Sequence, residues 1–86
     1  MGLLAMNPLQ RKLVIVLAGF GDNGATALEL ERAAHICQMK IYDEIATLAG
    51  MGMIVVYRKP RSGSSQLAAK LTDTAKGLLP RLKELA

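Results

Sequence analysis

The sequence predicts a mainly α-helical domain with one small β-hairpin, an α+β fold, and three features of the chain indicate it. Residues 26–54 carry apolar side chains at helical spacing on both sides of a short gap at 35–37, which is typical of two helices joined by a tight turn. Residues 53–57 (MIVVY) are rich in β-branched side chains and predict a strand. A stretch rich in glycine, proline and serine then leads to another apolar segment, as in a hairpin. The chain of 86 residues is expected to form a single domain, residues 1–86.

A first helix is expected to begin at Asn7-Pro8, because asparagine is a favoured N-cap and proline is favoured at the first helical position. A strand over residues 13–17 is the alternative, since the Val-Ile-Val run favours strands. Residues 19–24 (GFGDNG) predict a turn after this helix, and residues 25–27 predict a short strand. The main apolar face of the helix is formed by Leu9, Leu13, Val16, Leu17 and Phe20, with Val14 and Ile15 off that face.

The central pair of helices is expected at about residues 27–35 and 38–49. Ile41, Ile45 and Leu48 follow one another at i, i+4 and i+7, so they form a stripe that faces the core. The short connection between the helices favours the steep crossing of a helix-turn-helix. The outward face of the second helix then holds mostly uncharged side chains, namely Gln38, Met39, Lys40, Tyr42, Asp43, Ala46 and Thr47.

The hairpin, at about residues 53–71, is expected to hold strands at 53–57 and 66–71 around a flexible loop at 58–66 (RKPRSGSSQ). The formal net charge of the chain, +4, comes from residues 58–70 alone, because the remaining residues are balanced. A local basic patch beside serine hydroxyls is typical of phosphate contact, and the alternative is a charged, solvated hairpin tip. The side chains expected at this patch are Arg58, Lys59, Arg61, Ser62, Ser64 and Ser65.

A last helix is expected at about residues 73–85, with Thr72 as its N-cap. Pro80 inside it predicts a kink or a break, because proline lacks a backbone N–H. The elements therefore follow the order helix, short strand, helix, turn, helix, strand, basic hairpin tip, strand, helix. This order predicts a winged helix-turn-helix domain.

Two segments of the chain also carry a family pattern. The first consists of Glu29-Leu30, Ile36, Ile41, Ile45, Leu48 and Gly52-Met53-Ile54. The second consists of Leu71-Thr72, Gly77, Leu79-Pro80 and Leu82. Together, over residues 26–85, they resemble MarR-type regulators of bacteria and archaea, with the helix-turn-helix in the first segment and the residues after the wing in the second. The resemblance implies a recognition helix in the major groove of DNA and a basic wing on a phosphate or in the minor groove.

Specific contacts follow from the chemistry of the recognition helix. Gln38 suits adenine, Lys40 suits guanine or a phosphate, and Asp43 accepts from cytosine. Tyr42 suits a phosphate or a thymine methyl group. The alternative is a solvated face on which Lys40 pairs with Glu44 one turn away. The residues expected to contact DNA are Gln38, Met39, Lys40, Tyr42, Asp43, Thr47, Arg58, Lys59, Arg61, Ser62, Ser64 and Ser65.

The chain departs from the MarR pattern at three points. The long terminal helices by which full-size members dimerise are expected to be absent. Glu44 stands where an apolar residue is usual, and His35 stands where glycine is usual. The resemblance therefore implies a minimal winged-helix protein.

Other classes of protein are not expected. No general base stands beside a nucleophile, so an enzyme is not predicted, and no cofactor is expected. One histidine, His35, and one cysteine, Cys37, give neither a metal cluster nor an internal disulfide. Cys37 is interpreted as a helix-cap residue in preference to a redox switch. The longest apolar run, residues 13–20, is too short to span a membrane, and a cytoplasmic location is expected.

The first hypothesis for function is a sequence-specific double-stranded DNA-binding protein that regulates transcription. It is expected to act as a homodimer through residues 1–6, the first helix and the last helix. The alternative is a winged-helix protein-protein interaction module within a larger assembly. A third hypothesis is an architectural protein that binds DNA without regard to sequence.

Overall fold

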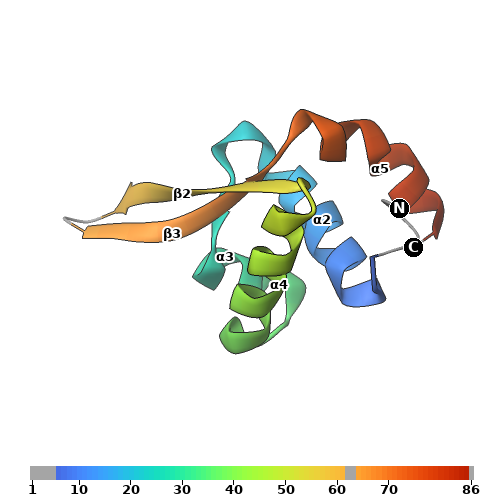
Figure 1. Cartoon of the computed structure of the whole chain (residues 1–86). Coiled ribbons are helices and arrows are strands. Elements are labelled where there is room, and N and C mark those ends of the chain that lie inside the picture. The colour runs from blue at the N-terminus through green and yellow to red at the C-terminus, as the bar shows by residue number, and fades with distance from the viewer. Residues whose placement is uncertain (1–5, 62–63, 86) are drawn as a thin grey trace.

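The computed structural model describes residues 6–61 and 64–85 (Figure 1). The described part of the chain holds four α-helices and a small antiparallel sheet, which confirms the expected α+β winged helix-turn-helix order. The alternative of a strand at residues 13–17 is wrong, since these residues are helical. The elements are α2 (Pro8–Phe20), the 3-10 turn η1 (Gly21–Asn23), β1 (Ala25–Thr26), α3 (Ala27–Ala34), α4 (Gln38–Gly50), β2 (Ile54–Arg61), β3 (Ser64–Leu71) and α5 (Asp73–Leu85).

Helix α2 begins with the cap that the sequence predicts. The Asn7 side chain accepts a hydrogen bond from the Gln10 backbone N–H at 2.8 Å, and the Gln10 side chain accepts from the Asn7 backbone N–H at 3.0 Å. This reciprocal pair satisfies two of the N–H groups that a helix start leaves without intrahelical partners. Val14, expected off the apolar face, is fully buried. The reason is that α2 runs through the middle of the core and contacts α3 and β3 as well as α5.

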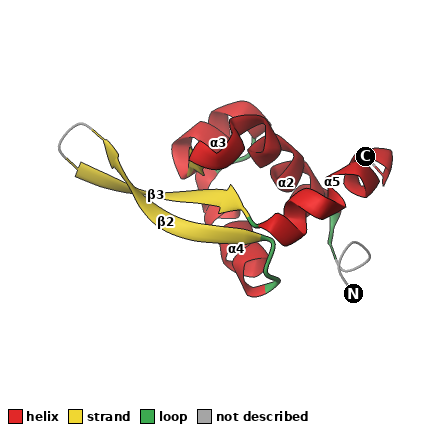
Figure 2. Ribbon diagram, turned by 90° about the horizontal axis from the view of Figure 1, so that it is seen from above, coloured by secondary structure: helices red, strands yellow, loops and turns green. Residues whose placement is uncertain are grey.

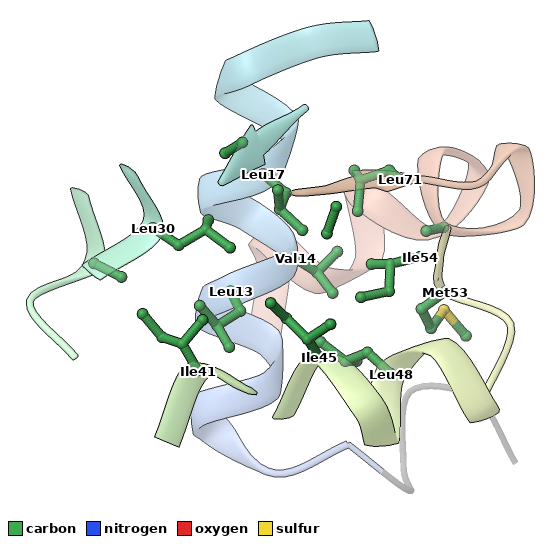
Figure 3. Close-up of a cluster of buried hydrophobic side chains, with 14 of the residues drawn as sticks. Leu13, Val14, Leu17, Leu30, Ile41, Ile45, Leu48, Met53, Ile54 and Leu71 are labelled. Atoms are coloured by element: carbon green, nitrogen blue, oxygen red, sulfur yellow. The ribbon is translucent and has the colours of Figure 1, made fainter. Parts of the chain in front are cut away.

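The core lies between α2, the helix-turn-helix and the sheet (Figure 3). Met6 is also buried there, so the described end of the N-terminal segment packs within its own chain. The largest fully buried side chains are Leu13, Leu17, Leu30, Ile41, Leu48, Leu82, Val14 and Thr26. The leucines and isoleucines of this set come from four different helices, so burial of the core holds the helices together.

The turn between α3 and α4 depends on His35, which adopts a left-handed conformation with φ of 58° and ψ of 43°. Its backbone N–H donates to the Glu31 carbonyl and closes the end of α3. A non-glycine residue in this region of backbone space costs about 1 kcal/mol, which is why glycine suits the position. Ile36 follows and packs against the core. His35 and Ile36 therefore both fix the turn between α3 and α4, as the sequence predicts for a helix-turn-helix.

The hairpin strands are longer than the sequence predicts. The pairing of β2 with β3 runs from Ile54 opposite Leu71 to Arg61 opposite Ser64, so the flexible loop expected at residues 58–66 is wrong. Pro60 is compatible with a strand here because β2 is at the edge of the sheet, whose strand order is β1-β3-β2. The strands extend away from the helices (Figure 2).

Helix α5 is continuous from Asp73 to Leu85 with Pro80 inside it, so of the two expected outcomes, a kink or a break, the break does not occur. Ala75 and Leu82 are both buried, one on each side of the proline. Their packing against the core offsets the backbone hydrogen bond that proline cannot make. Thr72 is the N-cap, as expected: its hydroxyl accepts from the Ala75 backbone N–H at 3.2 Å.

The η1 turn makes contacts with both the hairpin and helix α5. The Tyr57 hydroxyl donates to the Asn23 carbonyl, and the Lys76 ammonium donates to the Asp22 carboxylate. This hydrogen bond and the charge of Lys76 lower the pKa of Asp22 below its ordinary value. The Lys70 ammonium lies 5.6 Å from the centre of the Tyr57 ring. The turn therefore links the base of the hairpin to the start of α5.

Gly24 is closely packed against its neighbours, and this packing predicts the effect of a substitution there. Its φ is +68°, and a Cβ there would overlap the Ala69 carbonyl oxygen and lie 2.7 Å from the Tyr57 hydroxyl. Gly24→Ala is expected to lower the free energy of unfolding by about 1–3 kcal/mol, because both the backbone and the neighbours oppose the methyl group. Urea denaturation followed by circular dichroism measures the change.

The same substitution at Gly77 is the matched control. A Cβ there meets nothing within 4 Å, and the residue lies inside α5. Gly77→Ala is therefore expected to raise the free energy of unfolding by about 0.5–1 kcal/mol. Equal effects at both positions would contradict the packing described for Gly24.

Candidate nucleic-acid interface

The outward face of α4 is open, as its sequence predicts. Met39 is 80% exposed and Tyr42 is 46% exposed, and they are the most exposed large apolar side chains among the described residues. Gln38 differs from the others because it is half-buried at the start of the helix. The other exposed side chains of this face are Lys40, Asp43, Ala46 and Thr47.

The opposite side of α4 fixes which side chains face outward. Ile41, Ile45 and Leu48 are all buried in the core, as expected for the i, i+4, i+7 stripe. Since the three residues lie along one side of the helix, rotation of α4 would expose at least one of them. The outward face is thus set by the burial of the inward face.

A polar contact adds to this hydrophobic anchor. The Gln10 side-chain amide donates to one oxygen of the Glu44 carboxylate at 3.3 Å, and the Asn7 amide donates to the other at 3.5 Å. Gln10 is buried, with only 6% of its surface exposed. Glu44, which departs from the apolar residue usual in the MarR pattern, therefore joins α4 to the start of α2. Gln10 could not be predicted as its partner, because 34 residues separate the two in the chain.

The basic residues of the hairpin separate into two groups. Arg58 is exposed, whereas Lys59 is half-buried and its ammonium lies 3.9 Å from the Glu29 carboxylate of α3. Neighbouring residues in a strand point to opposite faces, so Arg58 and Lys59 belong to different sides of the hairpin. The backbone places Arg61 opposite Ser64 and Pro60 opposite Ser65 at the distal end. Ser62 lies outside the described residues.

A hollow of about 380 Å³ lies where the hairpin, α4 and the start of α3 meet. It brings together Gln38 and Tyr42 from the expected recognition helix and Arg58 from the expected wing. The other lining residues are Thr26, Ala27, Leu28, Gln66 and Leu67. The sequence analysis did not identify these five residues as part of the site.

The start of α3 had a recognisable signal in the sequence. Thr26 and Glu29 are spaced as in a capping box, and the structure has both bonds, from Thr26 N–H to the Glu29 carboxylate at 2.9 Å and from Glu29 N–H to the Thr26 hydroxyl at 3.2 Å. The N–H groups of the first turn that no cap satisfies are typical donors to an anion. The hollow has side-chain hydrogen-bond donors from α4 (Gln38, Tyr42) and from the hairpin (Arg58, Gln66), beside the start of α3.

No group of three histidine, cysteine, aspartate or glutamate residues in the described part of the chain is arranged to hold a metal ion. No helix among the described residues is long and apolar enough to cross a membrane. Cys37, which is exposed, precedes α4 as its N-cap residue, and its side chain makes no capping hydrogen bond.

The helix pair with its tight turn, the three-stranded sheet and the projecting hairpin define a winged helix-turn-helix protein. Solved structures of MarR-family regulators share this fold with the chain at TM-scores of about 0.8. No family model matches the chain, and none of the curated proteins matches it either. At identities below 20%, these likenesses establish a MarR-like winged-helix fold.

Three of the solved structures illustrate the likeness. BpsR of Bordetella bronchiseptica, whose DNA binding is regulated by 6-hydroxynicotinic acid, has a TM-score of 0.81 and 18% identity over 93% of this chain and 55% of its own. The reduced form of MarR from E. coli has a TM-score of 0.81 and 17% identity over 95% and 58%. A MepR mutant of S. aureus bound to an oligodeoxyribonucleotide has a TM-score of 0.81 and 15% identity over 95% and 59%. The chain thus spans less than two thirds of each of these structures.

The contact between Glu44 and Gln10 generates a prediction. Glu44→Ala is expected to lower the free energy of unfolding by about 1–2 kcal/mol, because it leaves the buried Gln10 amide without its acceptor. Chemical denaturation measures this effect. Asp43→Ala, on the exposed side of the same helix, is the control and is expected to change the value by about 0.5 kcal/mol or less.

A double substitution tests the cause of that loss. Gln10→Leu, Glu44→Leu and the pair form a double-mutant cycle, because Gln10→Leu alone also removes the capping bond from the Asn7 N–H. The loss in the double variant is expected to be smaller than the sum of the two single losses. A double variant whose loss equals that sum has no coupling between the two side chains, which would contradict a role for the hydrogen bond.

Proposed function

We propose that the chain is a sequence-specific double-stranded DNA-binding protein that regulates transcription. In this proposal α4 lies in the major groove, and the wing formed by β2 and β3 contacts phosphates or the minor groove. The observation that carries the proposal is the arrangement of α4, the start of α3 and Arg58 around one hollow, within a MarR-like winged-helix fold. The related fold of E. coli MarR has been solved with operator DNA, and that of S. aureus MepR with an oligodeoxyribonucleotide.

The exposure of α4 and the extension of the hairpin support this proposal. An α-helix fits the major groove when one side is free of other protein, and Met39, Lys40, Asp43 and Thr47 are exposed on that side of α4. The hairpin extends beyond the helices, so it reaches a neighbouring part of the duplex while α4 occupies the groove (Figure 1). A phosphate at the hollow would meet the Arg58 guanidinium, the Tyr42 hydroxyl and the first N–H groups of α3.

The distribution of charge supports the same reading. The only net charge of the chain is carried by residues 58–70, in the wing. Lys59 already pairs with Glu29, so we infer that it holds the wing against α3, whereas Arg58 and Arg61 meet phosphates. The serines that the sequence places near the tip, Ser64 and Ser65, would add short hydrogen-bond donors.

We propose that the protein acts as a homodimer. Helices α2 and α5 would form the interface, and they pack against each other at the end of the molecule away from the hairpin (Figure 1). Of the residues 1–6 also expected there, Met6 is buried in its own chain and the others lie outside the described residues. Leu78 and Leu79 of α5 are only half-buried within one chain. A dimer joined at this end would present two copies of α4 to half-sites about one duplex turn apart, roughly 34 Å.

The salt dependence of binding tests the phosphate contacts. Fluorescence anisotropy of labelled duplex DNA is expected to show affinity that falls steeply with salt, because each neutralised phosphate releases counterions. In Arg58→Ala/Arg61→Ala the slope of log K against log [salt] is expected to become shallower by about 2, near 0.9 for each lost contact.

Two variants control for this experiment. Lys83→Gln removes an exposed positive charge from α5, far from the wing, and is expected to leave the slope unchanged. Lys59→Met is expected to reduce affinity less than Arg58→Ala, since Lys59 is engaged with Glu29. If the wild-type protein binds no duplex even at low salt, the proposal is wrong and a protein-protein interaction module is favoured.

The dimer has a test of its own. Sedimentation equilibrium of the free protein is expected to give twice the mass of one chain, 9.2 kDa. A duplex with two half-sites one turn apart is expected to bind more tightly than one with a single half-site, because two linked contacts act together. A monomer in solution that binds both duplexes equally would contradict the dimer and leave the DNA-binding proposal intact.

A further inference from the structure

The exposed face of α4 has an unusual chemical composition for a helix that reads DNA. Met39, in its first turn, is 80% exposed, more than any other large apolar side chain among the described residues. The helix has no arginine and a single basic residue, Lys40. The face is therefore poor in the positively charged donors that the edge of guanine selects.

The position of Met39 matters as much as its exposure. In helix-turn-helix complexes the N-terminal residues of the recognition helix contact base edges. Met39 is the second residue of α4, and its neighbours on the same face one and two turns on are Asp43 and Ala46. A thioether chain at that place meets a base edge rather than a phosphate.

The major groove offers one apolar group, the C5-methyl of thymine. Burial of Met39 against a polar base edge would desolvate that edge without replacing its hydrogen bonds, which is costly. Burial against the methyl group removes apolar surface from water on both sides, which is favourable. The chemistry of Met39 thus selects thymine among the four bases.

The neighbours of Met39 on this face add little apolar surface. The Asp43 carboxylate, one turn on, accepts hydrogen bonds and therefore favours a base with an exposed amino group, cytosine or adenine, at its own position. The Thr47 hydroxyl donates to the Asp43 backbone carbonyl at 3.2 Å, so its donor is used within the helix. Ala46 adds only a methyl group to the face. Met39 is the side chain of this face with the largest apolar surface to bury.

We propose that Met39 is a specificity-determining residue that recognises thymine through its C5-methyl group. The proposal rests on the proposed function and deepens it by naming a base that α4 reads. It predicts that each half-site of the binding sequence holds a thymine whose methyl group is required, and that the hydrogen-bonding edge of that thymine is not sufficient.

Uracil substitution tests the proposal, because uracil differs from thymine only in lacking this methyl group. A binding sequence is first selected from a randomised duplex library with the wild-type protein. Each thymine of the selected duplex is then replaced by uracil in turn, and the dissociation constant is measured by anisotropy. Loss of one buried methyl group is expected to weaken binding about three- to fivefold at one position of each half-site, with little change elsewhere.

Two variants assign the effect to Met39. Met39→Ala is expected to bind the thymine and uracil duplexes equally and to fold normally, because the side chain is exposed. Val55→Thr is the matched control: it changes another exposed apolar side chain, 44% exposed on β2, and is expected to keep the preference for thymine.

The outcomes separate this inference from the function on which it rests. If the wild-type protein binds no duplex at low salt, both fall together. If it binds duplex DNA but the selection returns no preferred sequence, or uracil is tolerated at every position, the inference alone is wrong. It is also wrong if Met39→Ala keeps the thymine preference, and the apolar face of α4 would then be assigned to a protein partner.

Discussion

The structure depends on the burial of one side of α4 against α2. Ile41, Ile45 and Leu48 enter the same core as Leu13 and Leu17, and all five are nearly or completely inaccessible to water. Full burial of such side chains contributes roughly 1.5–3 kcal/mol each, so the rotation of α4 about its own axis is strongly determined. The face of α4 that is left exposed is therefore determined by the residues buried on its opposite side.

The wing is positioned by a different set of interactions. Its base is held by hydrophobic packing of Ile54 and Leu71, by the Tyr57 hydroxyl on the η1 turn, and by Lys59 beside Glu29. The last two contacts attach the hairpin to η1 and to α3. Because alternate residues of a strand face opposite sides, one row of side chains fixes the hairpin and the other row is left for a ligand. Arg58 belongs to the second row, since it lines the hollow beside α4.

Sequence patterns predicted most of the fold because its strongest signals are local. The caps at Asn7 and Thr72 depend on residues within one turn, and both have the predicted role. The stripe of α4 depends on spacing alone. The prediction of the hairpin's length was wrong because Pro60 and the serines disfavour a strand locally. Pairing along an edge strand tolerates them. Propensity is a weak guide where long-range pairing decides the outcome.

The candidate site was predictable in part for the same reason. The exposed side of α4 follows from its buried side, so Met39, Tyr42 and Asp43 could be placed on it from the sequence. Pairs that meet only in three dimensions could not be predicted, among them Lys59 with Glu29 and Glu44 with Gln10. From the sequence alone, a charged residue is interpreted as a candidate DNA contact when its partner within the protein lies far away in the chain. Lys59 is such a residue, since its ammonium lies 3.9 Å from the Glu29 carboxylate.

Glu44 stands where an apolar residue is usual in the MarR pattern, and a buried polar side chain, Gln10, accommodates it. A carboxylate on the side of α4 that faces α2 would be destabilising if apolar residues surrounded it. Here Gln10 stands in the first turn of α2, where its side chain already closes the capping box with Asn7, and its amide is left free to donate to Glu44. One glutamine thus satisfies the start of one helix and the carboxylate of another. The hydrophobic anchor of α4 fixes its rotation, and this polar contact adds a directional constraint at the end where α4 meets α2. Two constraints of different kind on the same helix leave its outward face with one orientation, which is what recognition of a base edge requires.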